Sequence, residues 1–133
     1  MPQTEVYFYQ ESEAEIPVWD WLRDLSRSDR KAAAACIARI RLLAMLGHEL
    51  RRPNADYLRD GIHELRVKRG RVNYRVLYFF HGQNVALLAH ALTKERAVPA
   101  REIDRAVERK RRYEKSPFKQ RATFVVPEAP DDL

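Results

Sequence analysis

The stretch of sequence that decides the fold is GIHELRVKRGRVNYRVLYFFHGQNVALLAHALTK, residues 61–94. Three runs rich in apolar residues follow one another in it, separated by short glycine-containing segments at residues 68–71 and 81–83. Short glycine-containing loops between such runs are typical of β-hairpins. The stretch therefore predicts three consecutive antiparallel strands, at residues 62–67, 72–80 and 84–93.

The segments around this meander predict three helices and a further strand. Pro17 suits the first turn of a first helix, and Pro99 opens the last one. Between them, apolar residues spaced three and four apart predict a second helix, with Ser28 as its N-cap and Gly47 at its end. The predicted elements are a strand at residues 5–9, helices at residues 17–25, 28–46 and 100–115, and a connection at residues 48–60.

This order of elements predicts an α+β fold in which a helical hairpin packs on a small antiparallel sheet, with a C-terminal helix. The 133 residues, 45% of them hydrophobic, are enough for one domain with its own core. We place that domain at residues 1–115. Residues 116–133 hold three prolines and no clear period, and we interpret them as a tail whose Thr-Phe-Val-Val segment is compatible with a short strand. Cys36 lies in a helical pattern and is expected to be buried.

The net charge of +6 is unevenly distributed along the chain. The first 25 residues hold six acidic residues and one arginine, whereas residues 26–115 hold 22 basic and ten acidic residues, a net charge of +12. A field of this sign attracts polyanions such as nucleic acid, although many small domains also carry a solvated charged surface. Apolar runs of about five residues are too short to span a membrane, and the N-terminus does not resemble a signal peptide, so we expect a cytoplasmic protein.

Charged side chains on the meander are the candidate functional residues. Strand alternation places Glu64 and Arg66 on one face of the first strand, and Arg75 can join them from the second. If the helical hairpin covers the more apolar face, these three converge on the opposite, open face, and Lys94 at the end of the third strand can close the group. Two arginines and a lysine suit a phosphate that gains negative charge in a transition state, and Glu64 could accept a proton.

Two interpretations of this group stay open on spacing alone. Cleavage of RNA by its own 2′-hydroxyl needs a base, an acid and cationic stabilisation, and no metal. Alternatively, Glu64 forms a structural cross-strand ion pair with Arg66 or Arg75. The four histidines are scattered, and the sequence has no recognisable zinc cluster, carboxylate cluster or glycine-rich phosphate loop. We therefore expect no cofactor. His90, four residues before Lys94, is either a satisfied strand histidine or part of the site.

Four motifs in this order resemble the RelE/HigB superfamily of toxins from type II toxin–antitoxin systems, and most closely its phage-derived HigB-like branch. The motifs are G-I-H-E-L-R-V, Y-R-V-L-Y-F-F, L-L-A-H-A-L-T-K and P-A-R-E-I-D-R-A. The similarity runs from about Val6 to Arg112. It implies a RelE-like fold and an mRNA interferase that cuts messenger RNA, usually in the ribosomal A site. It also implies a small antitoxin partner, often a helix-turn-helix protein, that neutralises the toxin.

The resemblance also implies roles for individual residues. Glu64 and Arg66 fall where the family places polar or basic residues facing RNA, Arg75 matches the arginine of the Y-R motif, and Lys94 matches the basic residue after the third strand. The RNA contacts that we expect in addition are Lys68, Arg69, Arg71, His90, Arg101 and Arg105. The chain departs from the pattern at Glu95, where many relatives have a second basic residue. It also lacks a clear counterpart of the C-terminal tyrosine that some relatives use for base stacking.

The leading hypothesis is therefore a ribosome-dependent, metal-independent endoribonuclease toxin. Arg66 and Arg75 would stabilise the scissile phosphate, with Lys94 and Glu64 as candidates for proton transfer, while the basic last helix would bind ribosomal RNA. The alternative is a catalytically weak module of the same fold that binds an antitoxin or nucleic acid without cleavage. A plain DNA-binding repressor subunit is less well supported, because no helix-turn-helix signature is present.

Overall fold

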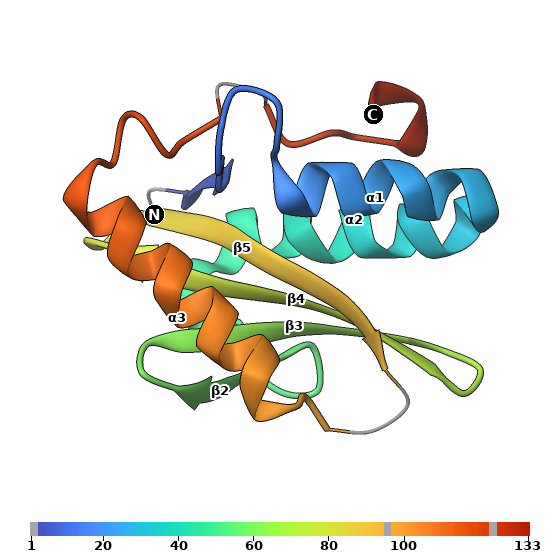
Figure 1. Cartoon of the computed structure of the whole chain (residues 1–133). Helices are drawn as coiled ribbons and strands as arrows, with labels where there is room; N and C mark the ends of the chain where they lie inside the picture. The colour runs from blue at the N-terminus through green and yellow to red at the C-terminus, as the bar shows by residue number, and fades with distance from the viewer. Residues whose placement is uncertain (1–2, 95–96, 123–124) are drawn as a thin grey trace.

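The computed structural model describes residues 3–94, 97–122 and 125–133, with Lys94 described by its backbone alone. A five-stranded sheet lies between two helices on one face and one helix on the other (Figure 1). The predicted α+β fold is confirmed. The strand order is β1-β5-β4-β3-β2, and the bounds are β1 Glu5–Phe8, β2 Ala55–Arg59, β3 Ile62–Arg69, β4 Val72–His81 and β5 Val85–Lys94.

The predicted meander forms the centre of the sheet, with β4 between β3 and β5. Both neighbouring pairs are antiparallel. Gly70 and Gly82 lie in the two hairpin turns with φ of 62° and 67°. Positive φ is the conformation that such turns require and that glycine adopts without steric cost. The two hairpins predicted from the glycine-containing turns are therefore confirmed.

The two outer strands differ from the prediction. β1 pairs with β5 in parallel at one edge of the sheet, whereas the chain re-enters the sheet after the two helices at β2, on the opposite edge. β2 lies inside the predicted connection at residues 48–60, so that prediction is wrong at its C-terminal end. The hairpin from β2 to β3 turns at Asp60 and Gly61, which both have positive φ. An Asp-Gly pair is a strong hairpin signal, but the segment before it lacks the apolar alternation of a half-buried strand.

The helices have the predicted positions with small shifts at their ends. They are α1 Pro17–Ser28, α2 Arg30–Leu46 and α3 Ala100–Lys115. The N-cap of α2 is Asp29 and not Ser28, because the Asp29 carboxylate accepts a hydrogen bond from the backbone N–H of Ala32 at 3.0 Å. An aspartate at this position also interacts favourably with the positive end of the helix dipole.

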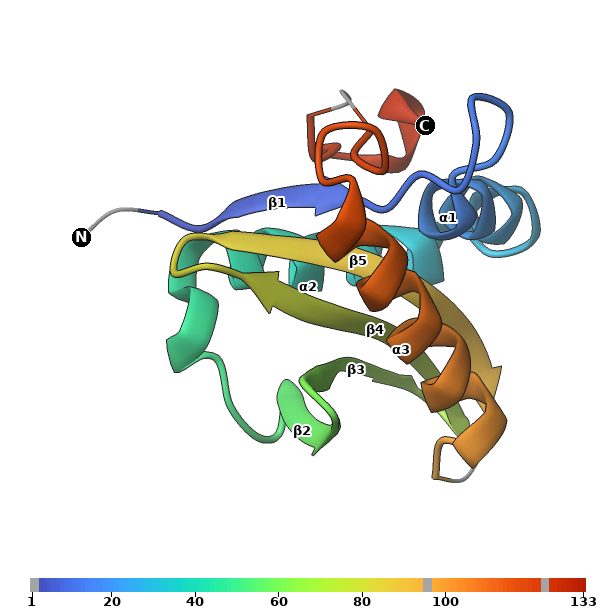
Figure 2. The same ribbon diagram turned by 60° about the vertical axis from the view of Figure 1, so that its left-hand side comes forward.

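Two hydrophobic clusters fill the spaces on either side of the sheet. One cluster joins α1 and α2 to the face that carries Leu65 and Val76, and it includes the buried Cys36, as expected. The other joins α3 to the face that carries Leu77 and Phe79. Figure 2 shows α3 in front of the sheet and α2 behind it. Residues on opposite faces of the same strand thus belong to two different hydrophobic clusters.

The C-terminal tail is bound to the edge of the sheet. The backbone N–H of Ala122 donates to the carbonyl of Phe8 at 3.0 Å, and Tyr9 forms an isolated bridge with Arg121. The acidic end of the tail then reaches α2, where Asp131 lies 2.7 Å from Arg30. Thr123 and Phe124, half of the segment that we considered as a short strand, lie outside the described residues. The tail therefore covers the β1 edge and part of α2.

Candidate functional site

The meander brings Glu64, Arg66 and Arg75 together on the face covered by α3. In the register of β3 and β4, Arg66 lies opposite Arg75, and Glu64 lies opposite Leu77. Directly opposed residues point to the same face of a sheet. Leu77 belongs to the hydrophobic cluster under α3, which identifies that face. Strand alternation was therefore enough to group the three side chains.

These side chains form a chain of contacts that runs from the interior to the surface. Nη1 of Arg75 lies 2.8 Å from both carboxylate oxygens of Glu64, and Nε of Arg66 lies 3.3 Å from Oε1 of the same carboxylate. The exposed fractions are 3% for Glu64, 7% for Arg75 and 40% for the Arg66 side chain. Arg75 thus binds Glu64 on the buried side of the carboxylate. On the exposed side, the carboxylate contacts the Nε edge of the Arg66 guanidinium.

The expectation of an open face is wrong for Glu64 and Arg75. Val98, just before α3, and Ile103, in α3, pack on the hydrophobic cluster of this face. Arg75 is buried so deeply that its Nε has no hydrogen-bond partner among the described residues. Arg66 is the member of the three that solvent reaches, so it is the one that can contact a ligand without rearrangement.

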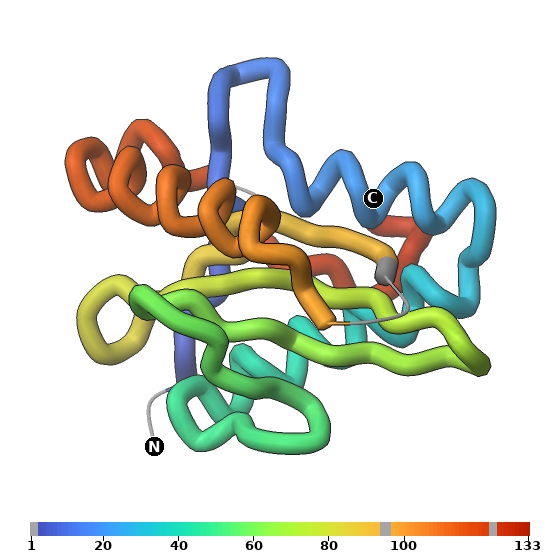
Figure 3. Tube along the Cα trace, turned by 60° about the horizontal axis from the view of Figure 1, so that its bottom comes forward, coloured from blue at the N-terminus to red at the C-terminus, as the bar shows by residue number. Residues whose placement is uncertain are grey.

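The basic hairpin between β3 and β4 extends this exposed region. Lys68, Arg69 and Arg71 are all exposed there, and the hairpin projects beyond the N-terminal end of α3 (Figure 3). Lys68 shares a face with Arg66 because the two are separated by one residue on β3. Lys94 pairs through its backbone with Asn73 of β4 at the same end of the sheet. The Lys94 side chain and Glu95 lie outside the described residues.

His90 is bound on both ring nitrogens by side chains of α3. Nε2 bonds the Glu102 carboxylate, and Nδ1 lies 3.1 Å from Nη1 of Arg109. An arginine can only donate, so Nδ1 accepts and the ring proton resides on Nε2, facing Glu102. Burial lowers the pKa of His90 and outweighs the opposing effect of the Glu102 carboxylate, while the charges of Arg109 and Arg105 lower this pKa further. This neutral histidine joins β5 to α3, and neither ring nitrogen is free to take up a proton without breaking a contact.

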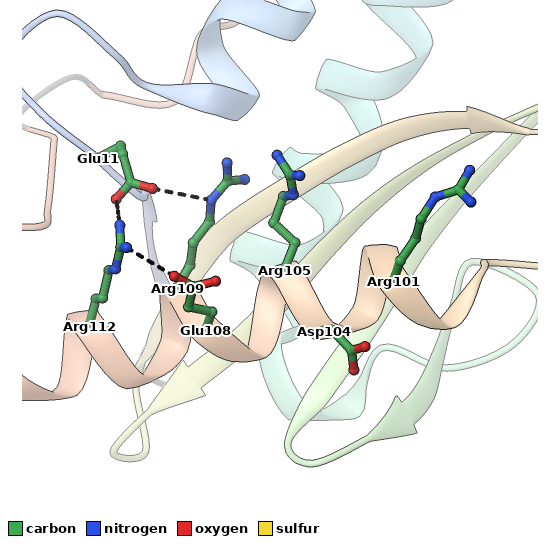
Figure 4. A pocket seen from close by; sticks show the side chains of 7 residues that line it. All are labelled: Glu11, Arg101, Asp104, Arg105, Glu108, Arg109 and Arg112. Atoms are coloured by element: carbon green, nitrogen blue, oxygen red, sulfur yellow. Dashed lines mark hydrogen bonds and ion pairs between the residues drawn. The ribbon is translucent and has the colours of Figure 1, made fainter.

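A charged groove runs along the side of α3. It has a volume of about 340 Å³ and is lined by four arginines and three acidic residues (Figure 4). Arg101, Arg105 and Arg109 project to the same side of the helix, one turn apart, while Asp104 projects to the other side. The groove therefore includes Arg101 and Arg105, which the sequence predicted to bind RNA.

Glu11, from the loop after β1, closes one end of this groove. Its carboxylate accepts hydrogen bonds from the Tyr9 hydroxyl at 2.8 Å and from Nη1 of Arg112 at 2.7 Å, and it lies 3.8 Å from Nε of Arg109. Burial alone would raise the pKa of Glu11, but these bonds and charges lower it below the ordinary value. Burial, with the adjacent Glu11, raises the pKa of Tyr9 to about 12.

Sequence reasoning did not identify Glu11, Glu102 or Arg109 as parts of a site. Glu102 was visible in the P-A-R-E-I motif, where its place in the first turn of a helix suggests dipole stabilisation rather than a partner. Glu11 and Arg109 are almost one hundred residues apart in sequence, and their contact arises from the parallel placement of β1 beside β5. No local signal indicates a contact of this kind.

The family assignment agrees with this geometry. A profile of the family described as "Phage derived protein Gp49-like" matches residues 20–111, more than half of the chain. The chain belongs to the phage-derived Gp49-like family. This family is part of the RelE/HigB-like toxin group, as the sequence motifs indicated. No curated protein matches the chain in sequence.

The Gp49-like segment contains Glu64, Arg66 and Arg75, which we call the meander cluster, and most of α3. Glu11 and the C-terminal tail lie outside the matched residues. None of the helices in the described ranges is long and apolar enough to cross a membrane. Within the same ranges, no three His, Cys, Asp or Glu side chains are grouped so that they could hold a metal ion.

Proposed function

We propose that this Gp49-like protein is the toxin of a type II toxin–antitoxin system, and that it cleaves messenger RNA on the ribosome. The observation that carries the proposal is the exposed Arg66, held by the buried Glu64–Arg75 pair at the base of a basic hairpin. RelE-like toxins are often ribonucleases, and family membership supports the same activity. Action on mRNA would place the protein in the cytoplasm.

In the proposed reaction, the 2′-hydroxyl oxygen of one nucleotide attacks the adjacent phosphorus. The O2′–P bond forms, the P–O5′ bond breaks, and the products are a 2′,3′-cyclic phosphate and a 5′-hydroxyl. The proton of the 2′-hydroxyl passes to a base, and O5′ receives a proton from an acid. The phosphorane-like transition state carries additional negative charge on its non-bridging oxygens, which a cation can stabilise.

Arg66 is the residue that we assign to the phosphate. Its Nε faces Glu64 at 3.3 Å, and among the described residues its two Nη groups have no hydrogen-bond partner, so they can form a pair of hydrogen bonds with phosphate oxygens. Arg75 then acts as a positioning residue, because its charge is already satisfied by Glu64. Glu64 and Lys94 are the candidates for proton transfer. Lys68, Arg69 and Arg71 on the hairpin would contact the RNA strand beside the cleaved bond.

Burial of the Glu64–Arg75 pair favours a second candidate function, a module of the same fold that binds an antitoxin or RNA without cleaving it. A carboxylate that is 3% exposed has no direct route to a 2′-hydroxyl in this conformation. The two functions share the antitoxin partner, which we propose to be a small helix-turn-helix protein. They differ in whether new RNA ends appear.

Primer extension on cellular mRNA after induced expression separates these functions. Cleavage predicts new 5′ ends within coding regions and arrested growth. The variant Arg66→Gln should reduce both by at least about a hundredfold, the order of effect that follows loss of one transition-state contact. Arg27→Gln is the matched control, because Arg27 is an exposed arginine on α1, across the sheet from α3. Undiminished cleavage by the Arg66→Gln protein would reject the assigned role, and absence of new ends with the parent protein would reject cleavage.

A further inference from the structure

The groove beside α3 contains two arginines, Arg101 and Arg105, that form no side-chain hydrogen bond or close ion pair within the described part of the protein, although the Glu102 carboxylate interacts with both through its charge. Each of the three acidic residues that line the groove is already paired. Glu11 and Glu108 bind Arg112 at 2.7 and 2.9 Å, and Asp104 pairs with Arg59 of β2. Arg109 donates to the backbone carbonyl of Ala89 at 2.8 Å. The positive charge that remains in the groove is therefore concentrated at Arg101 and Arg105, both exposed.

The two ends of the groove consequently differ. At the C-terminal end of α3, the Glu11 carboxylate lies between Arg109 and Arg112 and is oriented by the Tyr9 hydroxyl. This carboxylate occupies the place that an external anion would take. At the N-terminal end of α3, no acidic side chain in the described ranges bonds Arg101 or Arg105, and Figure 4 shows both guanidinium groups directed away from the helix axis on the same side.

We propose that Arg101 and Arg105 form a clamp for two consecutive phosphates of a single RNA strand. Glu11 ends this clamp, because its carboxylate occupies the place of a further phosphate between Arg109 and Arg112. Positions four residues apart on an α-helix are separated by about 6 Å along its axis, which resembles the distance between neighbouring phosphates of an extended strand. Each guanidinium can donate two parallel hydrogen bonds to one phosphate. The clamp rests on the proposed function, because it takes as its ligand the polymer that the neighbouring site would cleave.

The composition of the groove favours a nucleic-acid backbone over an acidic peptide. All of its lining residues are charged, and none is aromatic or aliphatic. Protein–protein interfaces depend on a desolvated core of aromatic and apolar residues, which is absent from this surface. Interfaces with nucleic acid are polar and strongly basic, and most of their contacts go to phosphates.

The clamp lies close to the meander cluster on the same side of the sheet. His90, which contacts Arg109 and Glu102 beside the groove, is opposite Leu77 of β4, and Leu77 is opposite Glu64 of β3. Two strand spacings separate His90 from Glu64, a distance of about 10 Å. An RNA strand with its scissile phosphate at Arg66 can therefore reach the clamp within a few nucleotides.

Binding of a 2′-O-methyl oligoribonucleotide, followed by fluorescence anisotropy over a series of salt concentrations, tests this clamp. The methylated strand cannot be cleaved, so the measurement is independent of whether the protein is a nuclease. The test variant is Arg101→Gln/Arg105→Gln. The matched control is Arg23→Gln/Arg27→Gln, which removes two arginines at the same spacing from α1, across the sheet from α3.

Loss of two phosphate contacts to a single strand should reduce the slope of log K against log salt concentration by about 1.4. At 0.1 M salt this corresponds to a roughly 25-fold loss of affinity. The control should retain the parental slope, and a single-stranded DNA of the same sequence should lose affinity by the same factor because the contacts go to phosphates. An unchanged slope in the test variant, or an equal change in the control, would overturn the clamp.

The variant Glu11→Gln tests where the clamp ends. Glutamine can still accept the Tyr9 hydrogen bond, but it removes the negative charge that occupies the Arg109–Arg112 end. We expect a steeper salt dependence than that of the parent protein, and an unchanged slope would contradict the role of Glu11. If a poly(glutamate) peptide displaced the RNA at a lower concentration than unlabelled RNA did, the groove would instead be a site for an acidic protein segment.

Discussion

The buried pair of Glu64 and Arg75 can be tested by a double-mutant cycle on the free energy of unfolding. Glu64→Leu leaves Arg75, which is 7% exposed, without the carboxylate whose two oxygens both lie 2.8 Å from its Nη1. Removal of one partner from a buried ion pair costs about 3–5 kcal/mol, because the other charge stays buried without compensation. Small domains have unfolding free energies of about 5–15 kcal/mol, so this single change removes a large part of the stability.

The double variant Glu64→Leu/Arg75→Met should recover most of this loss. Replacement of a buried pair by apolar residues of similar size is often nearly neutral, so we expect a coupling energy of about 2–4 kcal/mol. Urea titrations followed by the fluorescence of Trp19 and Trp21 on α1 measure it. The matched cycle on the exposed pair of Asp24 and Arg27, which are 3.9 Å apart, should yield at most about 0.5 kcal/mol.

A coupling energy below about 1 kcal/mol for the buried cycle would refute the argument that Glu64 and Arg75 bind each other in the folded protein. The double variant also has a functional consequence. If it folds and still produces new mRNA ends, Glu64 is not the proton acceptor, and Arg66 acts with another base. If it folds and is inactive while Arg66 is intact, the Glu64–Arg75 pair is needed for more than stability.

Three further properties follow from the structure. Because burial lowers the pKa values of His90 and His63, the unfolded chain binds more protons than the folded one below about pH 6.5. The free energy of unfolding should therefore fall on acidification from pH 7 to 5, and less steeply in His90→Gln; an identical slope would exclude His90 from this effect. Deletion of residues 116–133 should lower the melting temperature and promote association, measured by light scattering, because it uncovers the β1 edge. Burial raises the pKa of Cys36 to about 12, so a thiol reagent at pH 8 should label the unfolded protein but not the folded one, and rapid labelling of the native state would contradict the packing of α2.

Much of the fold could be predicted from local patterns. Residues 61–94 specify three strands through apolar runs separated by glycine turns, and the helix bounds follow from proline, apolar spacing and Gly47. The same alternation placed Glu64, Arg66 and Arg75 on one face, because side chains on a strand have a period of two. β2 was missed because one short edge strand carries little apolar alternation.

Burial and long-range pairing could not be predicted from the sequence. Whether Glu64 lies in solvent or in the interior depends on α3, which returns to the sheet after a separation of more than thirty residues. The contact of Glu11 with Arg112 depends on the parallel pairing of β1 with β5. The sequence alone thus determined the elements and the faces of their side chains, since both follow from backbone geometry. The tertiary structure decided which charges are exposed, since that depends on which elements meet across the sheet.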